Sequence, residues 1–375
     1  MQVALSQEQV QVQDGVCRLL NEHYGFEARQ RYAASERGWS EETWRLYADM
    51  GLQSLLVPSD CGGMEQRAED LLPVMQEMGR ALVLEPYFSS SVLATSALAA
   101  VGGAVAATLL KHAASGGHVL AIAGGALQAS ASAEPMLCAS GSGTNWRLDG
   151  RLQAVLQARD ADALVVAAPT DDAGACGLFA VDRQASGMRR HDIRLVDQRS
   201  ASDLVLDGVA ARLIAQPSPQ VDLALLRAHQ LGTAALVAEA AGVARAAFRI
   251  TTSYLSTRKQ FGRALSEFQA LRHRAADMLV SVTTVEAMAV LAAIAADHPE
   301  SPTADIDLAS AKLMASRHGR WVCEQAIQLH GAIGMTDEYV VGHYLQRMVV
   351  LENLLGHEGE QLDRLAALRD LECRP

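Results

Sequence analysis

The twelve residues from Arg258 to Gln269, RKQFGRALSEFQ, decide how this chain folds. They close a long helical pattern that starts near Asp222 and runs on almost without interruption. Arg258 stands where that helix would end before Phe261, so its guanidinium would be free to bind a pyrophosphate through two parallel hydrogen bonds. The same arginine could instead only interact with the C-terminal dipole of the helix. Phe261 could pack on an adenine or simply in the core.

A second stretch, QLHGAIG from Gln328 to Gly334, carries two glycines near the end of another helical segment. Gly331 and Gly334 permit a close approach of the backbone to a phosphate or to the edge of a ring. Either stretch alone is a weak signal. Together they favour a bound ligand over two ordinary helix ends.

The composition is that of a globular, helix-rich protein with more than one domain. Half of the 375 residues are hydrophobic, 20% are charged, and the formal net charge is −11. This net charge argues against a nucleic-acid-binding protein, which would need a basic face to neutralise phosphate. The six cysteines show no metal-type spacing, and the start MQVALSQEQV lacks the features of a signal peptide. We therefore expect a cytoplasmic protein with no metal site and no membrane span.

Changes in the pattern of apolar and turn residues divide the chain into three predicted domains. Residues 1–115 are helical, with Ser6 and Ser40 as N-caps. Residues 116–220 contain short apolar runs typical of strands, and Asp149-Gly150 predicts a type I′ hairpin turn. Residues 221–375 predict a four-helix bundle. The expected fold class is α+β and mostly α, with an N-terminal helical domain, a middle β domain and a C-terminal bundle.

Both stretches resemble motifs of one enzyme family. RKQFGRALSEFQ resembles the RKxFGxxLxxFQ motif of the acyl-CoA dehydrogenases, and QLHGAIG is similar to their QxxGGxG stretch, with Ala332 in place of a usual glycine. The order helices, β domain, helices agrees with that family from end to end. Combinations such as GRALVLEPY and GMTDEYVVGHY look like the small subunit of pimeloyl-CoA dehydrogenase and its relatives.

The resemblance implies FAD as cofactor, an oligomer, an acyl-CoA substrate and electron-transfer flavoprotein as a possible acceptor. In the family the two motifs reach across a subunit interface to the adenosine and diphosphate half of a neighbour's FAD. Carried over residue by residue, the FAD-binding positions are Arg258, Gln260, Phe261, Gln269, Gln328 and Gly331. The neighbour would be either a second copy or an acyl-CoA dehydrogenase partner in a heterotetramer.

The catalytic base of the family is missing from its usual positions. Removal of the α-proton of a thioester needs a nearby carboxylate, and the usual Glu position falls on Leu355. The alternative family position, on the first long helix of the bundle, falls on Gly232-Thr233. Glu352 and Glu239 are the nearest substitutes, although the first could face solvent and the second could serve in a polar contact between helices.

The half-site that would hold this chain's own flavin ring also differs from the family. The stretch AGGALQASASAEP (residues 123–135) stands where the family has a TEPGAGSD-like loop, and the usual tryptophan is replaced near LQARDADALVV (residues 156–166). Three hypotheses follow. The chain is a subunit that completes the FAD site of a catalytic partner, a self-sufficient dehydrogenase with a displaced Glu base, or a flavin-free scaffold or CoA-ester binding protein.

Overall fold

The computed structural model describes residues 5–127, 137–170 and 176–372. The chain forms two compact units, each assembled from separate stretches of sequence. The first unit comprises Met1–Arg31, Ala68–Val83 and Thr233–Pro375, and the second comprises Tyr32–Arg67 and Leu84–Gly232. The first compact unit combines N-terminal with C-terminal segments of the chain. The division into three continuous domains at residues 115 and 220 therefore stays a prediction.

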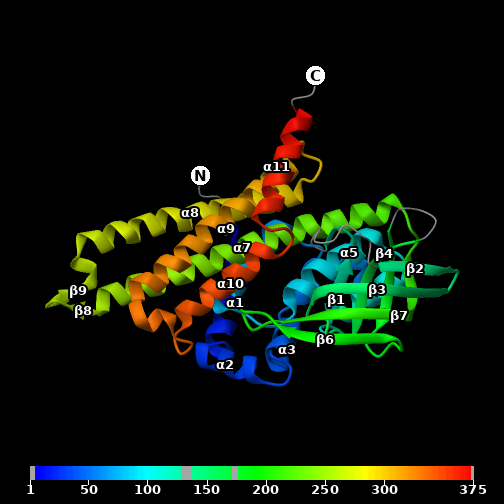
Figure 1. Cartoon of the computed structure of the whole chain (residues 1–375), viewed down its shortest axis with the longest axis horizontal. Helices are drawn as coiled ribbons and strands as arrows, with labels where there is room; N and C mark the ends of the chain where they lie inside the picture. The colour runs from blue at the N-terminus through cyan, green and yellow to red at the C-terminus, as the bar shows by residue number, and fades with distance from the viewer. Residues whose placement is uncertain (1–4, 128–136, 171–175, 373–375) are drawn as a thin grey trace. The chain divides into compact units, whose positions relative to one another are not determined.

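The first unit is helical throughout except for one short hairpin. Its long helices α7 to α10 run side by side along the bundle (Figure 1), and α8 packs extensively on α9. The helices are α1 (Gln7–His23), α2 (Phe26–Ala34, which ends in the second unit), α4 (Ala68–Ala81), α7 (Pro219–Thr257, which begins in the second unit), α8 (Gln269–Asp297), α9 (Ala304–His330), α10 (Val340–Asn353) and α11 (Glu358–Glu372). The hairpin consists of β8 (Lys259–Gln260) and β9 (Arg263–Ala264). The predicted fold class is confirmed.

The second unit combines short helices with a seven-stranded sheet of order β1-β4-β5-β7-β3-β2, in which β6 also pairs with β7. Its helices are α3 (Glu41–Asp49), the π-helix Tyr87–Ala94, α5 (Thr95–Val101) and α6 (Ala104–Ala114). Its strands are β1 (Leu120–Gly124), β2 (Leu137–Ser142), β3 (Asn145–Leu156), β4 (Ala163–Pro169), β5 (Cys176–Asp182), β6 (Met188–Arg194) and β7 (Ser200–Ala215). Alternating apolar side chains of these strands, including the fully buried Phe179, form the core of the sheet.

One turn prediction was wrong. Asp149-Gly150 is not a hairpin turn, because β3 runs through it and pairs Gly150 with Leu137 on one side and with Leu206 on the other. The chain instead reverses between β2 and β3 at Gly143, which has the left-handed φ of 60°. The pairing of β3 with β7 shifts register between Leu148 and Gly150, where Asp207 and Gly208 of β7 stand opposite the single residue Asp149.

Several local predictions are confirmed. Ser6 caps α1 in a capping box with Gln9, and the Ser40 hydroxyl accepts a hydrogen bond from the Thr43 amide at the start of α3. The small-residue run from Leu93 to Leu110 contains α5 and α6.

The apolar character of two long helices has different explanations. Both α7 and α8 are long and apolar enough to cross a membrane. In α7, 89% of the most apolar window is buried, as in the core helix of a globular protein. In α8 the buried share is only 44%, and Leu279, Val280 and Ile294 stay exposed. Helix α8 therefore keeps an apolar face that a single chain does not cover.

Candidate functional site

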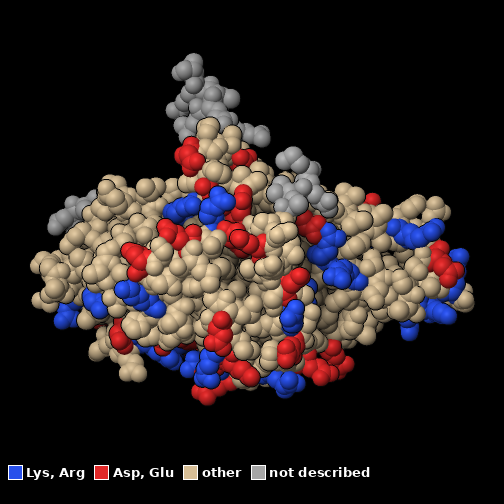
Figure 2. Space-filling model, turned by 180° about the vertical axis from the view of Figure 1, so that it is seen from behind, with Lys and Arg blue, Asp and Glu red and all other residues tan. Residues whose placement is uncertain are grey.

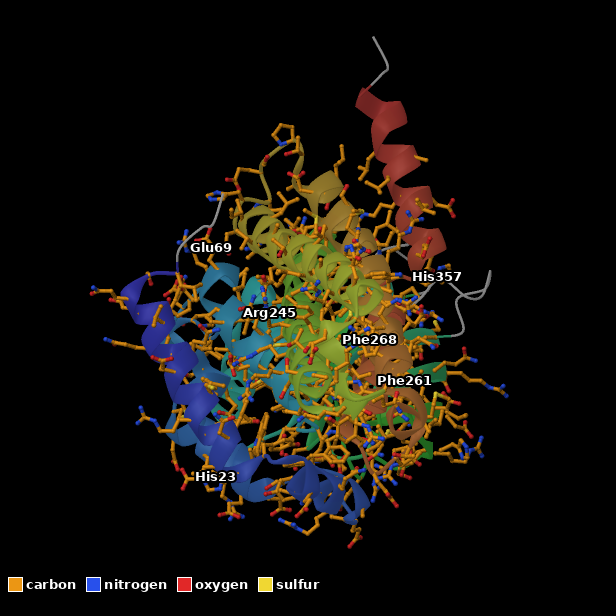
Figure 3. All side chains as sticks on the ribbon, turned by 90° about the vertical axis from the view of Figure 1, so that its left-hand side faces the viewer. His23, Glu69, Arg245, Phe261, Phe268 and His357 are labelled. Atoms are coloured by element: carbon orange, nitrogen blue, oxygen red, sulfur yellow. The ribbon has the colours of Figure 1, made fainter. Side chains whose placement is uncertain are left out.

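The segment Arg258–Gln269, which we call the arm, extends from the end of α7 to the start of α8. Phe261 and Gly262 form the turn of its hairpin with φ of 51° and 82°, as a type I′ turn requires. The Phe261 side chain is 91% exposed, so the prediction that it could pack in the core was wrong. Its ring meets Phe268 edge-on, with 6.2 Å between the centroids (Figure 3), and the Arg263 guanidinium lies 4.0 Å from the centre of the Phe268 ring.

The arm and the first turns of α8 carry an excess of positive charge. Within the part of the chain that the structure describes, five exposed basic side chains here make no ion pair: Arg258, Lys259, Arg263, Arg272 and Arg274. Figure 2 shows basic atoms gathered over the β8–β9 end of the bundle. The Arg258 guanidinium is exposed and is therefore accessible to an anion.

The second predicted stretch lies at the same end of the first unit as the arm. The His330 ring, at the end of α9, stacks on Tyr254 in the last turns of α7 with 4.4 Å between centroids, and the Tyr254 hydroxyl donates to the His330 carbonyl at 3.5 Å. Gln328 is exposed, and Gly331 ends α9 with a φ of 66°. The Tyr254–His330 contact therefore places the end of α9 beside the end of α7, from which the arm begins.

His330 within the QLHGAIG stretch and His343 in α10 are buried, and each lacks a hydrogen-bond partner for one ring nitrogen among the described residues. His330 Nδ1 bonds to the Ala326 carbonyl at 2.7 Å, and His343 Nε2 bonds to the Asp337 carbonyl at 3.0 Å. Their other ring nitrogens are buried without a partner in the described chain. Burial lowers the pKa of both rings, and the backbone carbonyls only partly oppose this shift.

The expected position of the catalytic base is a turn between two helices. Leu355 lies between α10 and α11 with the left-handed φ of 54°. Its carbonyl accepts a hydrogen bond from the Gln361 amide, and Glu358 pairs with Arg317 on the surface. The cluster of acids in this stretch serves the start of α11 and surface ion pairs.

Glu352, the first substitute base, forms an ion pair one turn before that position. Its Oε1 lies 2.7 Å from Arg320 Nη1. It also raises the pKa of the nearby Lys312, although burial dominates and lowers that pKa from its usual 10.5 to about 7. Lys312 is 2% exposed, and its ammonium donates to the Leu351 carbonyl in the last turn of α10.

Glu239, the second substitute base, is held by Arg347 from α10. Two hydrogen bonds of 2.8 and 2.7 Å join the guanidinium to the two carboxylate oxygens, and both side chains are almost completely buried. A carboxylate in this state is stabilised as an anion and is a poor proton acceptor. Sequence reasoning missed Arg347 and Lys312, and the signal would have been a lone cation within each of the apolar runs VVGHYLQRMVV and LASAKLMAS.

The half-site expected to hold this chain's own flavin ring lies in the second unit. Of the stretch 123–135, residues 128–135 lie outside the described part of the chain. Residues 156–166 contain no aromatic side chain, and Gln157 at the end of β3 has internal hydrogen-bond partners. The Gln157 amide donates to the Leu84 carbonyl at 3.0 Å and accepts from the Ser89 hydroxyl at 2.8 Å. These hydrogen bonds join the end of β3 to residues 84–89.

The family models agree with this geometry. Residues 6–116 match the N-terminal domain of acyl-CoA dehydrogenase, and residues 225–368 match the C-terminal domain. The chain is 30% identical to acyl-CoA dehydrogenase FadE27 of Mycobacterium tuberculosis over 340 residues, which cover 88% of each chain. It is 28% identical to acyl-CoA dehydrogenase IpdE2 of the same organism over 363 residues, or 96% of each chain.

Two solved structures of complexes are also similar. A variant of the Tcur3481-Tcur3483 steroid ACAD aligns with a TM-score of 0.88 and 29% identity over 98% of this chain and 99% of that one. A chain of the ChsE4-ChsE5 complex from Mycobacterium tuberculosis aligns with a TM-score of 0.88 and 26% identity over the full length of both. From these matches and the two motifs it follows that the chain belongs to the acyl-CoA dehydrogenase family.

Proposed function

We propose that the chain is an acyl-CoA dehydrogenase subunit that lacks its own catalytic base and completes the FAD site of a catalytic partner subunit. The observation that carries the proposal is the arm, whose aromatic tip is 91% exposed and whose cations have no ion pairs among the described residues. Such a segment adds little to the stability of a single chain. Its chemistry suits a ligand held by a neighbour.

The side chains of this end of the bundle fit the adenosine and diphosphate half of FAD. Arg258 can hold a diphosphate oxygen pair with its planar guanidinium. Phe261 offers an exposed ring for stacking on adenine, and the exposed amides of Gln260, Gln269 and Gln328 can donate to phosphate or ribose oxygens. Gly331 leaves its surroundings open, since a Cβ there would meet no atom within 4 Å.

The acid-base chemistry of the family would belong to the partner. In that reaction a carboxylate removes the α-proton of an acyl-CoA while the β-hydride passes to FAD. This chain has Leu355 at the usual position, Glu239 bound by Arg347, and Glu352 bound by Arg320. None of these groups is a free carboxylate, which supports a subunit without a base over a self-sufficient enzyme.

A hetero-oligomer explains a further surface. The exposed apolar side chains of α8, of Ile333 and of Met335, which is 77% exposed, would be covered by a partner subunit. The ChsE4-ChsE5 relative is named as a complex of two different proteins, which favours a heterotetramer over a homo-oligomer. Electron-transfer flavoprotein as acceptor and a cytoplasmic location are parts of the same proposal.

The test is to purify the chain alone and after coexpression with an acyl-CoA dehydrogenase encoded beside it. We expect a colourless, inactive lone chain and a complex with flavin absorbance that oxidises an acyl-CoA from a chain-length panel. Arg258→Gln should lower the flavin content of the complex severalfold, whereas Arg31→Gln, an exposed arginine outside the arm, should not. Stoichiometric flavin and acyl-CoA oxidation by the lone chain would overturn the proposal. A colourless complex would instead support a flavin-free scaffold.

A further inference from the structure

A cavity of about 570 Å³ lies within the first unit between α1, α4, α7 and α8. Its volume is that of a small-molecule site. Arg245, which lines it, is visible in Figure 3 between the helices of this unit. Its lining includes no residue of the arm and none of Glu239, Arg347 and Lys312. The cavity is therefore separate from the site that carries the proposed function.

The charged groups of the cavity leave one guanidinium free. Arg80 pairs with Glu77 at 2.5 Å, and Arg245 pairs with both carboxylate oxygens of Glu286. Arg249 lies one helical turn after Arg245, is exposed, and has no ion pair among the residues that the structure describes. Three guanidinium groups thus face two carboxylates, so the cavity carries a net positive charge.

The neutral groups that line the cavity include both apolar and polar side chains. Ala241, Gly242, Ala246 and Ile250 present the apolar surface of α7. The polar neutral groups include the amides of Gln13, Asn21 and Gln76 and the thiol of Cys17. Arg80 Nη2 lies 3.7 Å from the Cys17 sulfur, so the thiol reports directly on the interior of the cavity.

We propose that this cavity binds a small organic anion. Its carboxylate or phosphate group would be held by the free guanidinium of Arg249, with Arg245 one turn away, and its apolar body would rest on the small side chains of α7. Carboxylates and phosphates both match the planar donor fork of arginine. The same cavity offers no second free cation among the described residues, which fits one anionic group and disfavours a polyphosphate.

The experiment uses Cys17 as an internal reporter on the full-length protein. The rate of Cys17 alkylation by iodoacetamide is measured by peptide mass spectrometry while benzoate, phenyl phosphate or uncharged benzamide is titrated at constant ionic strength. Cys138 and Cys176, which lie outside the cavity, serve as references in the same sample. We expect saturable slowing of at least fivefold at Cys17 with benzoate, with phenyl phosphate or with both, and none with benzamide.

Variants assign the effect to the free guanidinium. Arg249→Gln should abolish the protection, Arg249→Lys should weaken it, and Arg31→Gln should preserve it. Isothermal titration with the same probes gives an independent measure that needs no thiol chemistry. Binding that is absent for both anions, equal for benzamide, or unchanged in Arg249→Gln would overturn the proposal. Since no arm residue is changed, flavin content of the complex distinguishes this failure from failure of the proposed function.

Discussion

The guanidinium of Arg347 holds both carboxylate oxygens of Glu239, with 2.8 Å from Nε to Oε1 and 2.7 Å from Nη2 to Oε2. The two side chains are 2% and 1% exposed. The pair joins α10 to α7 across the first unit and commits the one buried acid of α7 to a structural role. The Glu239 carboxylate is stable in the interior because Arg347 balances its charge. Proton exchange between Glu239 and a substrate would disrupt this pair and cost free energy.

The first prediction concerns removal of one partner of this pair. Arg347→Met leaves the Glu239 carboxylate buried without compensation, and we expect a loss of about 3–5 kcal/mol in the free energy of unfolding. The double variant Glu239→Leu/Arg347→Met removes both charges and should lose far less. Urea denaturation of the wild type, both single variants and the double variant measures the coupling. Additive losses would contradict the assignment of an ion pair.

The second prediction concerns the tip of the arm. Phe261→Asn keeps the positive φ that the turn requires, because asparagine tolerates this conformation, and it removes the ring. The stability of the lone chain should change by less than about 0.5 kcal/mol, since the side chain is 91% exposed. The flavin content of the complex should fall severalfold.

Phe261→Tyr is the matched control for that experiment, because it keeps an aromatic face at the same turn. It should retain the flavin. Full flavin content in the Phe261→Asn complex would show that the exposed ring serves another purpose.

How much the sequence could predict depended on the range of the interactions involved. Ser6 and Ser40 bind amides three residues away, and so local pattern was sufficient to place both caps. The turn at Asp149-Gly150 failed because pairing with β2 and β7 overrides the local preference of the dipeptide. The arm was predictable as one continuous stretch, whereas the Glu239–Arg347 pair joins residues 108 positions apart.

The third prediction concerns the turn at the expected base position. Leu355 has a φ of 54°, a conformation that costs an L residue with a large side chain about 1–2 kcal/mol. Leu355→Asn should therefore raise the free energy of unfolding by up to about 1 kcal/mol. Leu354→Asn, at an ordinary φ of −73°, should give no gain. Thermal unfolding of the two variants checks this, and equal effects at both positions would exclude relief of backbone strain.

The fourth prediction concerns pH. Burial lowers the pKa of His330 and His343, so the folded chain binds these protons less tightly than the unfolded chain does. Their contribution to stability is fully present above the ordinary pKa of about 6.5 and is lost as the pH falls below it. The urea midpoint should thus drop between pH 7.5 and pH 5.5. The drop should be smaller in His330→Gln/His343→Gln and unchanged in the exposed control His191→Gln.

The last prediction concerns the crossing of α4 and α7. A Cβ added to Gly242 would lie 1.9 Å from the Gln76 carbonyl oxygen, so the two helix backbones touch at this position. Replacement of glycine by alanine inside a helix normally stabilises by up to about 1 kcal/mol. At Gly242 the sign should reverse, with a loss of about 1–3 kcal/mol, because the helices must separate. Gly25→Ala, in the turn between α1 and α2, is the control for the steric effect alone, since no atom lies within 4 Å of a Cβ there. Equal stability of Gly242→Ala and the wild type in urea would show that α4 and α7 separate at this position without a cost in free energy. The cavity beside Gly242 could then also change its shape at little cost.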